Sequence, residues 1–217
     1  MSTLVVVAAS GLAREALAVD GLVDAFDRVV VLDDDPRLWD GELAGFPVLG
    51  GGLERVVELT RHQVLVCAGS GRARRTIVAR LSDLGVGPQR FTSVRHPSVD
   101  VPAGCSVGEG SILLAHVTLT RDVRVGRHVV AMPGVTLTHD VVVEDFATLC
   151  AGVSVGGHVR VCEAAYLGMN SSVRERVVVG DGATLGMGAA LLTDLPDHET
   201  WVGVPAARHH ARLPVRV

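Results

Sequence analysis

The feature that most restricts the fold is a six-residue repeat in the second half of the chain. Beginning at Val101, every sixth residue is aliphatic for sixteen successive positions, without an insertion. These residues are Val101, Val107, Leu113, Leu119, Val125, Ala131, Leu137, Val143, Leu149, Val155, Val161, Leu167, Val173, Val179, Leu185 and Leu191. Because roughly half of the residues in an ordinary protein are apolar, chance produces such a run about once in tens of thousands of trials. We therefore interpret the period as structural.

A period of six differs from the 3.6 of an α-helix and from the alternation of a long strand, so each hexapeptide is predicted to be a short strand plus a corner. Three such sides close a triangle of about eighteen residues. Residues 101–190 then make about five coils, stacked to a height of roughly 24 Å. The aliphatic residues are predicted to point inward and to form the core of this prism.

Two further columns accompany the aliphatic one. Small or β-branched residues stand four places after it, which indicates limited space: Cys105, Ser111, Val117, Val123, Val129, Val135, Val141, Ala147, Val153 and Val159. Glycines follow the aliphatic residue directly at Gly108, Gly126, Gly156, Gly168, Gly180 and Gly186. Without a Cβ, these glycines permit strained corners or the close approach of a ligand.

The first part of the chain has a different pattern. Strands are predicted at 3–8, 28–33 and 63–67, and helical segments at 12–20, 53–61 and 71–84. This βαβαβ order predicts a small Rossmann-like parallel sheet covered by helices. We expect two domains, an α/β domain at 1–95 and a β-helix domain with a C-terminal tail at 96–217.

Composition excludes several classes of function. The net charge is −4 and the chain has no long basic cluster, so no nucleic-acid partner is expected. The apolar run from Leu4 to Ala9 is too short for a signal peptide or a membrane span. Four cysteines without a CxxC pair indicate reduced thiols and no metal cluster. The expected location is the cytoplasm.

The loops of the α/β domain are candidates for ligand binding. The first strand runs through Ser10 and Gly11 into a helix, where backbone N–H groups can bind an anion or a sugar hydroxyl. Asp33 and Asp34 end the second strand, where a carboxylate can accept hydrogen bonds from a ribose or a base; the alternative is a solvated turn. Gly69 lies in the loop after the third strand.

One histidine of the repeat is followed by a carboxylate. His139 stands two residues after Leu137 and precedes Asp140. Imidazole is suited to removing a proton from an attacking amine or hydroxyl, and a carboxylate on its other ring nitrogen fixes the tautomer. His139 and Asp140 are therefore the predicted catalytic pair, the alternative being an exposed histidine at a corner.

The repeat resembles the [LIV]-G-x-x-x-x pattern of the hexapeptide transferases, which form a left-handed parallel β-helix and act as trimers. Handedness comes from this resemblance alone, since general chain physics favours right-handed crossovers. Over essentially the whole chain the layout resembles the NeuD/PglD-like sugar acetyltransferases of the sialic acid, bacillosamine and perosamine pathways. The matching segments are Ala8 to Ala13, Leu32-Asp33-Asp34, and Ala68-Gly69 with Arg74.

The resemblance implies roles for individual residues. His139 is the general base with Asp140, and the Gly157 N–H serves the oxyanion. Acetyl-CoA is expected at Thr148, Gly157, Gly168, Met169, Gly186, Gly188 and Arg208. The acceptor is expected at Ser10, Gly11, Asp33, Asp34, Gly69 and Arg74. The chain departs from the family at Thr148, where relatives often carry a second histidine, and at Ala207, where lysine is common.

The predicted function is N-acetylation of a nucleotide-linked amino sugar by direct transfer from acetyl-CoA, in a homotrimer, without a metal and without a membrane partner. One alternative is O-acetylation of a sugar such as sialic acid. Another is a zinc enzyme like the γ-type carbonic anhydrases, which uneven histidine spacing and the extra domain disfavour. A third is a trimer that binds nucleotide sugars without catalysis.

Overall fold

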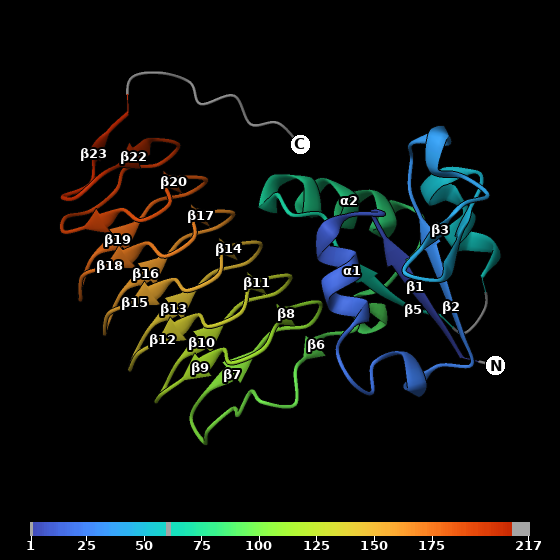
Figure 1. The fold of residues 1–217 in the computed structure, drawn as a ribbon, viewed down its shortest axis with the longest axis horizontal. Coiled ribbons are helices and arrows are strands. Elements are labelled where there is room, and N and C mark those ends of the chain that lie inside the picture. The colour runs from blue at the N-terminus through green and yellow to red at the C-terminus, as the bar shows by residue number, and fades with distance from the viewer. Residues whose placement is uncertain (1, 60–61, 210–217) are drawn as a thin grey trace.

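The computed structural model describes residues 2–59 and 62–209 and shows an α/β part beside a stack of coils (Figure 1). The α/β part has strands β1 (Thr3–Val7), β2 (Arg28–Leu32), β3 (Glu42–Leu43), β4 (Phe46–Leu49) and β5 (His62–Val66), helices α1 (Gly11–Leu17) and α2 (Gly71–Asp83), and 3₁₀ helices η1 (Val23–Ala25), η2 (Pro36–Leu38), η3 (Gly52–Glu58) and η4 (Pro88–Arg90). The sheet order is β3-β4-β2-β1-β5. All pairs are parallel except β3 with β4.

Two details of the α/β part differ from the prediction. The helical segment expected at 53–61 is the 3₁₀ helix η3, and residues 60 and 61 lie outside the described residues. Gly51 and Gly52 have left-handed φ values of 98° and 67°, so this segment follows a tight turn and stays short. The hairpin of β3 and β4 was not predicted; it turns at Gly45, where φ is 83°.

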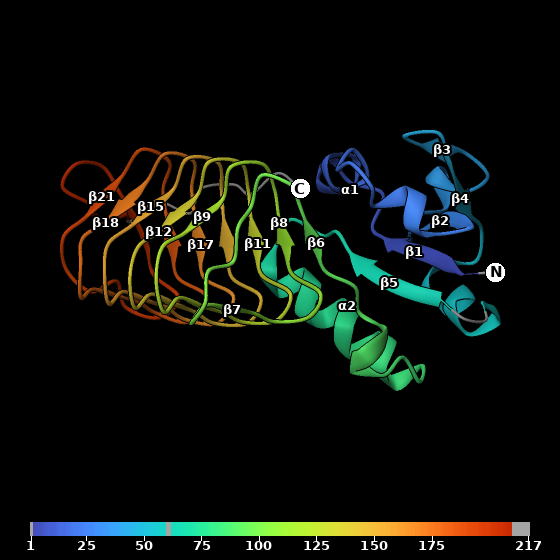
Figure 2. The same ribbon diagram turned by 90° about the horizontal axis from the view of Figure 1, so that it is seen from below.

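The coils form three sheets of short strands, most of them two residues long. Sheet I contains β7 (Ser106–Val107), β10 (Arg124–Val125), β13 (Val142–Val143), β16 (Arg160–Val161) and β19 (Val178–Val179). Sheet II contains β6 (Val94–Arg95), β8 (Ile112–Leu113), β11 (Val130–Ala131), β14 (Thr148–Leu149), β17 (Tyr166–Leu167), β20 (Thr184–Leu185), β22 (Thr200–Val202) and β23 (Ala207–Arg208). Sheet III contains β9 (Thr118–Leu119), β12 (Thr136–Leu137), β15 (Ser154–Val155), β18 (Ser172–Val173) and β21 (Ala190–Leu191). Figure 2 shows these coils stacked along one axis.

The aliphatic column forms the core of the coils, as predicted. From Leu113 to Leu191 every member is at most 4% exposed and belongs to one hydrophobic cluster. Val101 and Val107, at the open end of the stack, are half-buried. Burying each such side chain contributes about 1.5–3 kcal/mol, so the repeat itself stabilises the coils. The β6 strand pairs with β8 and extends sheet II before the predicted domain boundary at residue 95; the division into 1–95 and 96–217 stays a prediction.

The strained positions of the coils lie at the third residue after each inward one. Left-handed φ values of 53° to 92° form three corner columns. Corner column A joins sheets III and I and contains Gly104, Asp122, Asp140, His158 and Arg176. Corner column B joins sheets I and II and contains Gly110, His128, Phe146, Ala164 and Gly182. Corner column C joins sheets II and III and contains His116, Gly134, Gly152, Asn170 and Gly188.

The glycines directly after the inward residues are explained by close packing between coils and not by backbone strain. None of the six has a left-handed φ, so the expectation of strained corners there is wrong. A Cβ at Gly108 would lie 2.6 Å from the Gly126 carbonyl carbon of the next coil, and one at Gly168 would lie 2.6 Å from the Met187 nitrogen. These glycines therefore allow successive coils to approach closely.

The α/β part contacts the coils through the start of α2. Gly71, its first residue, lies against corner column B, so that a Cβ there would overlap the Phe146 carbonyl oxygen. Arg74, one turn later, is fully buried between the two parts. Of the helices in the described ranges, none has the length and apolarity needed to cross a membrane.

Candidate functional site

His139 and Asp140 lie together at corner column A, with His158 one coil further on. Nδ1 of His139 is 2.8 Å from Oδ2 of Asp140, and Nε2 of His158 is 3.7 Å from the same oxygen. The two imidazole rings meet edge to face with centroids 5.1 Å apart. The hydrogen bond from His139 lowers the pKa of the Asp140 carboxyl. An ionised carboxylate only accepts hydrogen bonds, so in the neutral His139 ring the proton is on Nδ1 and the lone pair is on Nε2.

The coil geometry explains why these side chains meet. Asp140 and His158 are equivalent residues of successive coils, with φ of 60° and 59°. Aspartate and histidine are among the few residues other than glycine that are enriched at such φ values. The His158 N–H donates to the His139 carbonyl oxygen at 3.1 Å, which holds the two corners in register. The backbone repeat thus places two imidazoles around one carboxylate.

Gly157 lies directly against the His139 ring. A Cβ at Gly157 would stand 2.5 Å from Cε1 and 2.6 Å from Nε2 of His139. The Gly157 carbonyl accepts a hydrogen bond from the Arg176 N–H, whereas the Gly157 N–H has no hydrogen-bond acceptor within the described ranges 2–59 and 62–209. The predicted oxyanion donor and the predicted base are therefore neighbours.

The residues predicted to bind acetyl-CoA are dispersed. Gly168 and Met169 precede corner residue Asn170 of column C, and Gly186 and Gly188 belong to the next corner of that column. Met169 is 45% exposed, and a Cβ at Gly188 would meet no other atom within 4 Å. Arg208 in β23 forms a salt bridge with Glu199 at 3.2 Å. Column C thus forms an open edge separate from His139.

Thr148 and Arg74 occupy the junction between the two parts, which the prediction missed. Thr148 is 1% exposed, and its hydroxyl donates to the Gly69 carbonyl oxygen at 3.1 Å. The Arg74 guanidinium donates to Thr148 Oγ1 and to carbonyl oxygens of Ala68, Gly69, His128, Phe146 and Ala147, at 2.8 to 3.0 Å. Burial lowers the pKa of Arg74 to about 10.

These contacts change the interpretation of both residues. All five N–H groups of Arg74 already have acceptors, so the structure contradicts its predicted contact with the acceptor. Thr148 is likewise covered by the loop that carries Gly69 and does not face an open acetyl-CoA groove. A basic residue at a helix start is normally solvated; this one is buried because Gly71 lets the helix touch the coil.

The remaining acceptor residues gather at one edge of the parallel sheet. Ser10 caps α1, accepting from the Ala13 N–H at 3.1 Å and donating to the Cys67 carbonyl oxygen at 2.6 Å. Asp33 accepts from the N–H groups of Ala9 and Asp35 at 2.7 and 2.9 Å. These bonds tie the ends of β1, β2 and β5 together, with Gly11 and Gly69 exposed beside them.

Asp34, next along the chain, is exposed and makes its own contacts. It accepts from the Leu53 N–H at 3.1 Å and forms a salt bridge with Arg80. The five residues from the three loops therefore share one edge of the sheet, although each carboxylate also has protein partners; their contact with the acceptor stays a prediction.

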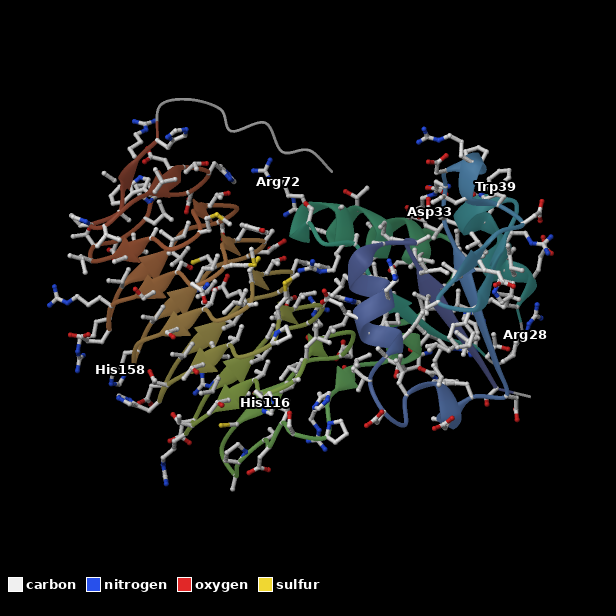
Figure 3. All side chains as sticks on the ribbon, in the orientation of Figure 1. Arg28, Asp33, Trp39, Arg72, His116 and His158 are labelled. Carbon is white, nitrogen blue, oxygen red and sulfur yellow. The ribbon has the colours of Figure 1, made fainter. Side chains whose placement is uncertain are left out.

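The imidazole pair and this sheet edge face different regions of one chain. Figure 3 shows His158 at the far side of the coils from Asp33. Neither of two clefts found among the described residues is lined by His139. One is lined by residues including Arg124, Gly126, Glu144, Asp145 and Glu163, and the other by residues including Arg72, Arg75, Glu163, Asp181 and His198. In a single chain, the predicted catalytic histidine and the predicted acceptor-binding edge of the sheet are therefore separated.

Comparison with known proteins gives structural matches over nearly the whole chain. No protein-family model matches the sequence, and no curated protein sequence matches it. The acetyltransferase domain of PglB from Neisseria gonorrhoeae FA1090, solved with acetyl coenzyme A, is similar with a TM-score of 0.85 and 26% identity, covering 95% of this chain and 98% of that one.

A second match is a mutant of GDP-perosamine N-acetyl transferase from Caulobacter crescentus, solved with CoA and GDP-perosamine. Its TM-score is 0.86 and its identity 25%, covering 96% of this chain and 97% of that one. WeeI from Acinetobacter baumannii AYE shares the fold, with a TM-score of 0.82 at 23% identity over 96% of this chain and all of that one.

These matches extend over both parts of the chain and agree with the repeat, the parallel coils and the added α/β sheet. They also support the left-handed β-helix that the sequence resemblance implied. The chain therefore has the fold of the hexapeptide-repeat, left-handed β-helix acetyltransferases, and over both of its parts it is similar to the acetyltransferase domain of PglB and to GDP-perosamine N-acetyl transferase.

Proposed function

We propose that the protein transfers an acetyl group from acetyl-CoA to the amino group of a nucleotide-linked amino sugar. The observation that carries this proposal is the convergence of three residues: Nδ1 of His139 is held by Asp140, and Gly157 lies directly against the His139 ring, where a Cβ would meet Nε2. The similar structures support the substrate class, since one was solved with acetyl coenzyme A and another with CoA and GDP-perosamine.

In this reaction Nε2 of His139 takes a proton from the acceptor amine while the amine nitrogen attacks the thioester carbonyl carbon. Asp140 orients the ring and stabilises the imidazolium that forms. The Gly157 N–H donates to the carbonyl oxygen as it becomes an oxyanion. The tetrahedral intermediate then collapses, the carbon–sulfur bond breaks, and CoA leaves.

The cysteines support direct transfer without an acyl-enzyme. Burial raises the pKa of Cys67 to about 12 and that of Cys162 to about 11, and it also raises the pKa of Cys150. These three thiols are protonated near neutral pH, and a thiol is a far weaker nucleophile than a thiolate. The free state of all four cysteines agrees with the cytoplasmic location that we propose.

The separation of the two half-sites supports a homotrimer. His158, which shares the Asp140 carboxylate with His139, lies at the far side of the coils from Asp33 at the sheet edge (Figure 3). An acceptor bound at that edge reaches an imidazole only if a second copy supplies it. Exposed apolar side chains on the coils give such a contact its surface: Tyr166, Met169, Val178, Met187 and Leu192. Acetyl-CoA is proposed to lie between copies, beside Gly168, Met169, Gly186 and Gly188.

The test measures CoA release with acetyl-CoA and a panel of UDP-, dTDP- and GDP-linked amino sugars. His139→Ala is expected to reduce turnover by about 100-fold or more, the range of general-base catalysis. His116→Asn is the control, because His116 is another exposed histidine of the repeat, at a left-handed position of corner column C away from His139.

Product analysis distinguishes an N-acetyl from an O-acetyl sugar. Full turnover in His139→Ala contradicts the base assignment, and binding of a nucleotide sugar without CoA release from any acceptor contradicts the enzymatic proposal.

A further inference from the structure

The side chain of His158 has no role in the proposed transfer, yet it faces the same carboxylate as His139. The ligand atoms of His139, Asp140 and His158 all lie within 4.8 Å of one another. All three residues are exposed, so a solvated ion can reach them. We propose that these residues form an inhibitory binding site for a divalent transition-metal cation of the zinc type; the inhibition, though not the binding, rests on the proposed function.

The distances fit a small cation. Zinc takes ligand atoms at about 2.0–2.1 Å in a tetrahedron, which places those atoms about 3.3 Å from one another. The two separations from Asp140 Oδ2, 2.8 Å to His139 and 3.7 Å to His158, bracket that value. Side chains at exposed corners adjust by a few tenths of an ångström without moving the core.

The chemistry of the donors selects the class of ion. Two imidazoles and one carboxylate suit zinc and its neighbours in the first transition row, whereas magnesium and calcium prefer oxygen ligands alone. Three protein ligands leave one coordination position for water. A second group of three possible ligands, Glu144, Cys162 and Asp181, is a weaker candidate for a metal site. Glu144 is already paired with Arg160, and burial raises the pKa of Cys162 to about 11, which disfavours the thiolate that binds a metal.

Binding at this site removes the base through a change of tautomer. Nδ1 of His139 lies 2.8 Å from the Asp140 carboxylate, and because an ionised carboxylate only accepts hydrogen bonds, the neutral His139 ring carries its proton on Nδ1 in the free protein. A metal bound to Nδ1 needs the lone pair of that nitrogen, so the single proton of the neutral ring moves to Nε2. Nε2 then has no lone pair to accept the acceptor's proton. No bond other than the N–H bonds and the metal–ligand bonds changes.

The experiment titrates the metal-free full-length protein with Zn²⁺ by calorimetry and with Co²⁺ by visible absorption. We expect a tight site whose affinity falls by at least about tenfold in His158→Asn. Asparagine tolerates the left-handed corner, as Asn170 shows at φ 56°. The matched control His116→Asn is expected to bind like the unchanged protein.

Activity provides a separate measurement. Zn²⁺ is expected to inhibit CoA release reversibly, with recovery on chelation, and His158→Asn is expected to need at least about tenfold more Zn²⁺ for the same inhibition. Unchanged metal affinity in His158→Asn, or an equal loss in His116→Asn, overturns the proposal. Because binding is measured without substrates, a protein that binds the metal at His158 but transfers no acetyl group contradicts only the proposed function.

Discussion

The contact between the α/β part and the coils makes a prediction about Gly71. Gly71 is the first residue of α2, a position where alanine is normally better than glycine by up to about 1 kcal/mol. A helix with free space around it would therefore be stabilised by Gly71→Ala. The structure predicts the opposite sign, because the added Cβ would overlap the Phe146 carbonyl oxygen and lie 3.2 Å from the Ala164 Cα.

The magnitude follows from the atoms that must move. Both neighbours are backbone atoms of corner column B, which cannot rotate away, so the first turn of α2 must retreat by roughly 1 Å to restore ordinary contact. Arg74 moves with that turn, and its bonds to Phe146 and Ala147, now 2.8 and 3.0 Å, weaken. Overpacking and weakened bonds cost about 3 kcal/mol together. Subtracting the helix preference leaves a net destabilisation of about 2 kcal/mol.

The assay is thermal unfolding followed by circular dichroism. A loss of about 2 kcal/mol lowers the Tm of a protein of this size by roughly 4–8 °C. Gly11→Ala is the matched control, since Gly11 is the first residue of α1 and a Cβ there meets no other atom within 4 Å. Its Tm is expected to stay the same or to rise. A Gly71→Ala protein as stable as the unchanged one would refute the close contact between α2 and the coils.

Two further predictions concern buried and reactive imidazoles. His128 is 3% exposed, and burial lowers its pKa to about 4. The unfolded chain therefore binds a proton at a higher pH than the folded one, and acid favours unfolding. Urea unfolding should show the free energy of unfolding falling by up to about 3 kcal/mol between about pH 6.5 and about pH 4, and falling less in His128→Asn. Gly157→Ala should lower turnover on the order of 100-fold, because the added Cβ displaces the His139 ring. Its circular dichroism spectrum should be unchanged, and full activity in this variant would contradict the close contact between Gly157 and His139.

Much of the fold could be predicted because the signal is repeated. The same inward aliphatic position recurs in every coil, as at Leu137, Val155 and Val173, so an atypical residue at one position does not change the predicted fold. The hairpin of β3 and β4 has no such repetition, and β3 is only two residues long. Nothing in the local pattern of Glu42 and Leu43 separates an edge strand from a loop, because the pairing depends on β4 lying beside β2.

The site was predictable where it depended on neighbours in the sequence. His139 and Asp140 are adjacent, and the imidazole–carboxylate bond followed from that adjacency. His158 needed one more step: it stands one coil after Asp140, so the coil length was the signal that it shares the carboxylate. Arg74 could not be placed, since its acceptors are backbone carbonyls whose positions depend on how helix α2 and corner column B meet.

The corner columns explain how one repeat serves both docking and chemistry. Inward positions must be aliphatic, whereas a corner residue need only tolerate a left-handed backbone, at roughly 1–2 kcal/mol when it is not glycine. Column B uses this tolerance for Phe146 and His128, which stack at 5.3 Å beneath α2. Column A places Asp140 and His158 one strand spacing apart, about 4.8 Å, on another edge of the prism. The two edges are joined by the strands of sheet I and by the aliphatic core, so a corner substitution that leaves those strands in place also leaves the geometry of the other corner in place.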